Sequence, residues 1–202
     1  MVKSKKVKQS MQMTENPTVA FPDAAAFSLW LASNHAVSSG VWLTISKKGA
    51  ATASVTYAEA VEVALVWGWI DGQKAKLDDT RWLQRFTPRG ARSMWSKINR
   101  EKASALLAAG TMMPPGVAEV ERAKQDGRWE RAYDSPKNAT VPADLAAALA
   151  ESPRAQKFFG TLEARNRYAV LWRIQNAKKA ETRARRIAQF VEMLAKGEKL
   201  HP

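Results

Sequence analysis

The chain has 202 residues, of which 46% are hydrophobic and 25% charged. This size and composition are typical of one globular domain, or of one domain with an added lobe. The absence of cysteine and the presence of only two histidines exclude disulfides, thiol nucleophiles, cysteine-based zinc sites and multi-histidine metal centres. A net charge of +13 favours anionic partners such as nucleic acid or lipid headgroups, or simply serves solubility.

The first 18 residues are polar and basic, and no apolar signal-peptide core follows them. We therefore expect residues 1–18 to form a disordered basic tail. No apolar run approaches the roughly 20 residues that a transmembrane helix needs. The expectation is a cytoplasmic protein without a transmembrane segment.

Residues 19–127 alternate between helical and strand patterns, which predicts an α+β core. Asp23 is placed to cap a first helix, and residues 41–46 alternate apolar with polar side chains as a strand does. Thr56 and Glu59 have the spacing of a capping box that begins a second helix. Asp78-Asp79 then predicts the turn of a hairpin over residues 73–87, which Pro88 ends.

The rest of the chain is predicted to be helical. Helices are expected over residues 94–109 and 115–126, before a linker at residues 128–141. A C-terminal helical lobe at residues 142–202 is predicted to contain helices over 142–151, 153–163, 166–177 and 180–195. The predicted fold is α+β, with a small antiparallel sheet of about three strands packed with helices and followed by this lobe.

Residues 67–99 combine four of the eight tryptophans with several arginines. An arginine fork binds carboxylate or phosphate with two hydrogen bonds, and aromatic rings can stack on it. We therefore predict a cleft for a small anion or a protein segment, lined by Trp69, Asp71, Arg85, Arg89, Trp95 and Asn99. The alternative is structural: Asp71 would serve as a turn residue or pair with Arg85 or Arg89, and the rings would belong to the core.

Two further hypotheses stay open. A basic face on the last helix, formed by Lys178, Lys179, Arg183, Arg185 and Arg186, could bind nucleic acid or another polyanion, or could simply be solvated. An uncharacterised enzyme could use Asp71 or His35 with an arginine clamp. His35 also suits the dipole at a helix end, and acid–base candidates are few, so we favour a non-enzymatic protein without cofactor or metal.

Several motifs together resemble the YdeI/OmpD-associated, bacteriocin-protection-like family of small bacterial proteins, over roughly residues 21–197. They are Gly40-Val41-Trp42-Leu43, Gly68-Trp69-Ile70-Asp71-Gly72, Arg85-Phe86-Thr87-Pro88-Arg89, Trp95-Ser96-Lys97-Ile98-Asn99, and the stretch from Ala177 to Ile187. The resemblance implies a binding or stress-protection role, including defence against bacteriocins or cationic antimicrobial peptides. It brings no catalytic residue set with it.

Overall fold

The computed structural model describes residues 16–177 and 179–202. These residues form two compact units, which are described separately. The sheet unit comprises residues 16–93 and 101–129, and the helical unit comprises residues 94–100 and 130–202. Residues 1–15 of the expected tail lie outside the described residues.

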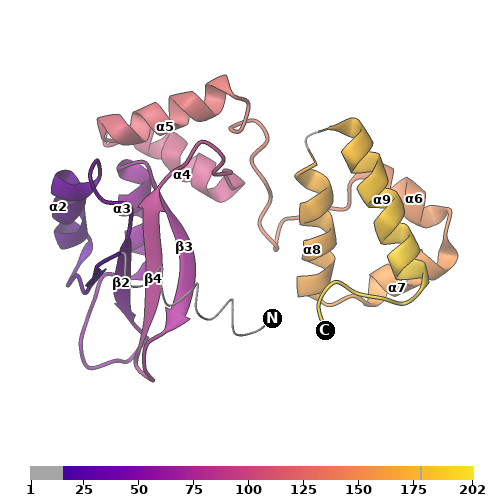
Figure 1. The fold of residues 1–202 in the computed structure, drawn as a ribbon, viewed down its shortest axis with the longest axis horizontal. Coiled ribbons are helices and arrows are strands. Elements are labelled where there is room, and N and C mark those ends of the chain that lie inside the picture. Colours follow the sequence, from indigo (N-terminus) through magenta and orange to yellow (C-terminus); the bar gives the residue numbers. More distant parts are fainter. Residues whose placement is uncertain (1–15, 178) are drawn as a thin grey trace. The chain divides into compact units, whose positions relative to one another are not determined.

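The described part of the sheet unit contains a four-stranded sheet in the order β1-β2-β4-β3 (Figure 1). Its strands are β1 (Thr18–Val19), β2 (Val41–Ser46), β3 (Trp69–Lys76) and β4 (Arg81–Pro88). The α+β prediction is confirmed, but the sheet has four strands rather than three. It is also mixed, because β1 pairs parallel to β2 whereas the other pairs are antiparallel.

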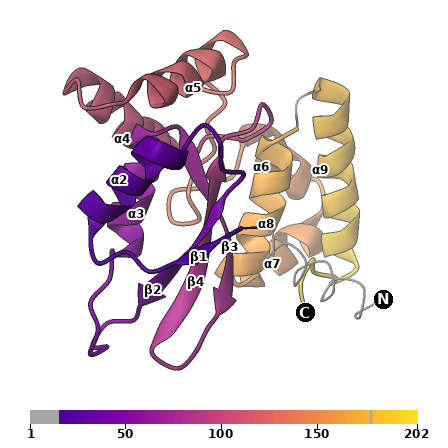
Figure 2. The ribbon, with the colours of Figure 1, turned by 60° about the vertical axis from the view of Figure 1, so that its left-hand side comes forward.

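Two helices cover one face of this sheet (Figure 2). Helix α2 (Ala24–Asn34) begins at Asp23, whose carboxylate accepts a hydrogen bond from the Ala26 amide at 2.8 Å. Helix α3 (Tyr57–Val66) begins at Thr56, and the predicted capping box with Glu59 is present. Their apolar sides form the core with alternate strand residues, including Val41, Leu43, Ile45 and Phe86.

Helix α5 (Pro114–Gln125) packs against the end of α3 at unusually close range, and Gly116 makes this possible. A Cβ atom on Gly116 would lie 2.3 Å from the carbonyl oxygen of Val66, far inside van der Waals contact. On the other side of the contact, Gly68 has a φ of +73°, and its Cβ would lie 2.7 Å from the Pro115 oxygen. Both glycines are therefore required by the approach of the two backbones.

Helix α4 (Lys97–Ala108) begins in the helical unit and continues in the sheet unit. The helical unit then contains α6 (Ala143–Ala150), α7 (Pro153–Thr161), α8 (Ala164–Gln175) and α9 (Ala180–Ala195). Its core gathers buried residues from all four, including Leu145, Phe159, Ile174 and Leu194. No helix in the described part of the chain is long and apolar enough to cross a membrane.

Candidate functional site

Trp69 and Asp71 lie on the helix-covered face of the sheet. Trp69 is buried, with its ring edge-on to that of Trp30 at 5.9 Å. Asp71 belongs to β3 rather than to a separate turn, and it pairs across the sheet with Phe86, which places both side chains on one face. The Tyr57 hydroxyl donates to its carboxylate at 2.8 Å.

Arg85 points to the opposite face, because neighbouring strand residues alternate and Phe86 faces the helices. Its Nε and Nη2 donate to the side-chain oxygen of Asn16 at 3.0 and 2.8 Å. The hypothesis of an ion pair between Asp71 and Arg85 is therefore wrong for the described residues. From the sequence, the alternation of side chains along this strand was compatible with Arg85 on either the helix-covered or the opposite face of the sheet.

Arg89 is buried, with 4% of its surface exposed, and it lies in a cluster of charged groups. Its backbone oxygen accepts a hydrogen bond from Arg122 at 3.1 Å. Burial raises the pKa of the neighbouring Glu119, while the positive charges of Arg122, Arg128 and Arg89 oppose the rise. Arg89 thus belongs to a charge network inside the sheet unit.

The other two residues of the predicted cleft belong to the helical unit. Trp95 is buried there, and the Asn99 amide donates to the hydroxyl of Ser96 at 3.1 Å, as expected for a capped helix start. The six predicted residues are thus divided between two units and, within the sheet unit, between two faces of the sheet. Ligand binding by them stays a prediction.

The basic face predicted on the last helix is partly used for internal contacts. Arg183 donates Nε and Nη2 to the two carboxylate oxygens of Asp144 at 2.6 and 2.9 Å. Arg186 donates to the backbone oxygen of Arg173, whereas Lys179 and Arg185 are exposed. Lys178 lies outside the described residues. His35 ends α2, where its Nδ1 donates to the Leu31 oxygen at 2.9 Å.

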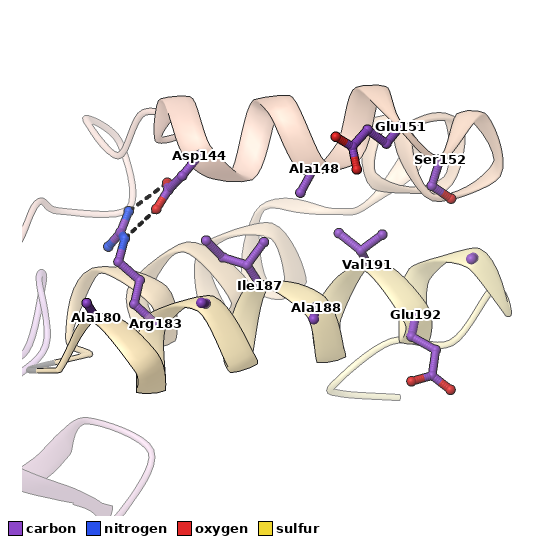
Figure 3. A pocket seen from close by; sticks show the side chains of 12 residues that line it. Asp144, Ala148, Glu151, Ser152, Ala180, Arg183, Ile187, Ala188, Val191 and Glu192 are labelled. Atoms are coloured by element: carbon purple, nitrogen blue, oxygen red, sulfur yellow. Dashed lines mark hydrogen bonds and ion pairs between the residues drawn. The ribbon is translucent and has the colours of Figure 1, made fainter.

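A groove of about 780 Å³ runs between α6 and α9 in the helical unit. Small side chains create it: Ala148 of α6 lies across the groove from Ala188 of α9 (Figure 3), and Ala184 also lines it, so that alanines leave the space between the helices unfilled. The branched side chains of Ile187 and Val191 complete the apolar lining. We call this the α6–α9 groove.

The stripe differs from the surface that α9 buries in the core. The groove residues of α9 recur at helical spacing from position 180 to position 195. The core side is formed by Ile187, Phe190 and Leu194, so Ile187 lies at the border of both. Helix α9 therefore carries two adjacent apolar surfaces, only one of which is filled by the unit's own side chains.

Acidic groups rim the groove. At one end the ion pair of Asp144 and Arg183, with its two hydrogen bonds, connects the two helices. Glu151 lies on the α6 side toward the other end (Figure 3). Glu192 stands on the α9 side, where Lys196 binds it at 2.7 Å. Three carboxylates and one guanidinium give the lining a net charge of −2, which Lys196 beside Glu192 reduces to −1, in a chain whose net charge is +13.

Two of these carboxylates are held in their charged form. Hydrogen bonds from Arg183 lower the pKa of Asp144 below its ordinary value. The hydrogen bond from Lys196 lowers the pKa of Glu192 in the same way. Both carboxylates are therefore ionised at neutral pH, each beside a cationic partner. Within the described residues, no group of three or more histidine, aspartate or glutamate side chains is arranged to hold a metal ion.

Sequence reasoning missed this groove, although a signal was present. The sequence of the last helix shows an apolar stripe of Ala180, Ala184, Ile187, Val191 and Leu194, and all of these except Leu194 line the groove. Arg183 was predicted to lie on a basic face that either binds a polyanion or is solvated, and its partner Asp144, 39 residues earlier, was not foreseen. Only the packing of α6 on α9 brings the two together.

Two family models match the chain in different regions. Residues 19–119 match a domain of unknown function, DUF8412. Residues 138–197 match the family described as "Bacteriocin-protection, YdeI or OmpD-Associated". The predicted resemblance is therefore confirmed for the C-terminal part, whereas the tryptophan and arginine motifs of residues 40–99 lie in the DUF8412 match. No curated protein and no solved structure matches the chain significantly.

Proposed function

We propose that this chain, which belongs to the DUF8412 family and carries a YdeI/OmpD-associated domain at residues 138–197, is a non-enzymatic stress-protection protein. It acts by binding cationic, amphipathic peptide segments in the α6–α9 groove. Bacteriocins and cationic antimicrobial peptides are the ligands that this role implies. The observation that carries the proposal is an apolar groove with an acidic rim in a strongly basic chain.

The shape of the groove supports a helical peptide as the ligand. An amphipathic helix can lay its apolar side chains into a groove between two helices. The alanines of α9 give such side chains room, while Ile187 and Val191 supply apolar contact. Each ligand methylene that leaves water here contributes about 0.8 kcal/mol.

The charges support a cationic ligand. Glu151 and Glu192 stand at the edges of the groove, where lysines on the polar side of a bound helix would reach them. The remaining charge of the chain repels a cationic peptide over longer distances. Binding of such a peptide in the α6–α9 groove would therefore depend on the local negative potential of that groove.

The first test is titration with a fluorescent 18-residue helical peptide made of leucine and lysine. The wild-type chain should bind it, and a leucine–glutamate peptide of equal length should not bind. Ala188→Phe fills the groove and should weaken binding at least tenfold. Glu151→Gln removes a rim charge and should weaken it several-fold.

Glu181→Gln is the matched control, because Glu181 lies on α9 but does not line the groove. It removes the same charge and should leave the affinity unchanged. If Ala188→Phe binds the leucine–lysine peptide as tightly as the wild type does, the groove is not the binding site. Survival of bacteria that express each variant, challenged with a cationic antimicrobial peptide, then tests the protective role itself.

A further inference from the structure

The sheet unit has a second hollow, of about 500 Å³, at the turn end of the β3–β4 hairpin. This end is the lower end of the sheet in Figure 2. Four of the six residues that line it are cationic, and a tryptophan forms its aromatic wall. The lining consists of Lys47, Lys74, Ala75, Lys76, Arg81 and Trp82. We call this hollow the hairpin groove.

The strand register explains why these side chains converge. Lys76 pairs directly with Trp82, and Lys74 pairs with Gln84, so Lys74, Lys76 and Trp82 project from one face of the sheet. The Trp82 ring is half-buried and lies 5.8 Å from the ring of Tyr57, at the start of α3. The indole is therefore held in place while part of it faces the groove.

Two acidic residues in the hairpin turn offset only part of the positive charge. The Asp78 carboxylate is bound by the turn itself, accepting hydrogen bonds from the backbone amides of Thr80 and Arg81 at 2.8 and 2.7 Å. It also pairs with the Arg81 guanidinium at 2.8 Å. Asp79 pairs with Lys76 at 3.0 Å, but both side chains are largely exposed, so this pair contributes little.

The two remaining lysines keep their charge uncompensated. Lys47 donates to the backbone oxygen of Asp79 at 2.8 Å, which places its amine without neutralising it. Lys74 forms no ion pair within the part of the chain that the structure describes. Four cations and two carboxylates leave the hairpin groove and its turn with a net charge of +2.

We infer that the hairpin groove binds a nucleotide unit of single-stranded nucleic acid. The base stacks on the indole of Trp82, and the flanking phosphates contact Lys74 and Lys47. Proteins that bind single strands combine a positive groove with an aromatic ring on which a base can stack. A polyanion without bases would use the lysines but would gain nothing from the indole. This inference is independent of the proposed function, because the groove lies in the other unit and takes a ligand of opposite charge.

The test is fluorescence anisotropy of a labelled 12-nucleotide oligothymidine at about 50 mM salt, where surface charges are weakly screened. Trp82→Leu should weaken binding on the order of 5- to 150-fold, the range that loss of one stacked base produces. Trp82→Phe keeps a ring and should retain most of the affinity. Lys74→Gln should reduce the slope of log K against log salt by about 0.7, the value for one phosphate contact on a single strand.

Lys199→Gln is the matched control, since it removes one exposed lysine from the helical unit and should leave both affinity and slope unchanged. Thermal midpoints of all variants show that each is folded. If Trp82→Leu is unstable, Trp82→Phe and Lys74→Gln still decide the question. Absence of binding by the wild type overturns the inference. Three other results would also overturn it. Heparin or a mononucleotide could compete with the labelled strand as well as an unlabelled strand does. Lys199→Gln could lose as much affinity as Lys74→Gln.

Discussion

The close contact between α3 and α5 predicts that Gly116→Ala destabilises the sheet unit. The new Cβ would lie 2.3 Å from the Val66 oxygen and 3.0 Å from the Leu65 oxygen, both of which are backbone atoms. Ordinary contact begins near 3.4 Å, so the end of α3 must move by about 1 Å. This movement also disturbs the hydrogen bond from the Met113 amide to the Val66 oxygen, now 3.1 Å long.

The expected cost follows from these contacts. Overpacking of this kind costs about 1–3 kcal/mol, and a weakened hydrogen bond adds up to about 1 kcal/mol. The helical preference of alanine returns about 0.5–1 kcal/mol. The net loss in the free energy of unfolding should therefore be about 0–3.5 kcal/mol, centred near 2 kcal/mol. Gly160→Ala in α7 is the matched control, since its Cβ meets no atom within 4 Å; it should gain about 0.5–1 kcal/mol.

Urea denaturation, followed by tryptophan fluorescence and far-ultraviolet circular dichroism, measures both variants against the wild type. The two substitutions add the same atoms, so the difference between them isolates the local packing. Because the propensity gain is common to both variants, the difference should equal the overpacking and hydrogen-bond costs, about 1–4 kcal/mol. A Gly116→Ala variant as stable as Gly160→Ala would refute the close approach of α3 and α5.

Three further predictions concern single side chains. Asp144→Asn should make the stability of the helical unit less sensitive to acid. Arg183 lowers the pKa of Asp144, so the ionised carboxylate stabilises the fold above its ordinary pKa near 3.9, and this stability is lost as the pH falls through the lower pKa of the folded state. Acid melts of the wild type and of Asp144→Asn should therefore converge at low pH. Burial raises the pKa of Tyr168 to about 12, so the stability that it contributes is complete below pH ~10 and is lost as the pH rises through 12. In an ultraviolet titration, Tyr168→Phe should lose absorbance change near pH 12 relative to the wild type. Thr56→Ala deletes the capping box with Glu59 and should cost about 1 kcal/mol in urea denaturation; an unchanged midpoint would contradict the role of this cap.

Local signals sufficed for much of the fold. The side chains of Asp23 and Thr56 cap helices where the sequence predicted them, because a cap depends on neighbours within four residues. Strand β1 was missed, since two residues are too short to show alternation. The start of β3 at Trp69 was also missed, because glycines on both sides of Trp69-Ile70-Asp71 are typical of a turn.

The candidate site was harder to predict, because it depends on contacts between distant segments. The sequence gives no sign that Arg183 is neutralised by Asp144, and it cannot tell a filled apolar stripe from an open one. Similarly, the alternation in β4 was visible, but the face occupied by Arg85 depends on which side the helices cover. Residue patterns limit the choices, and packing selects among them.

Strand β3 is an edge strand of the sheet, and this position has a consequence for self-association. An edge strand exposes unpaired backbone groups that can pair with a strand of another molecule. Here the pairing register shifts between Asp71 and Lys74, and the strand continues with two charged side chains, Lys74 and Lys76. The irregular pairing and the like charges of Lys74 and Lys76 disfavour pairing of this edge with the same edge of a second copy. These lysines therefore also reduce edge-to-edge aggregation during folding and at high concentration.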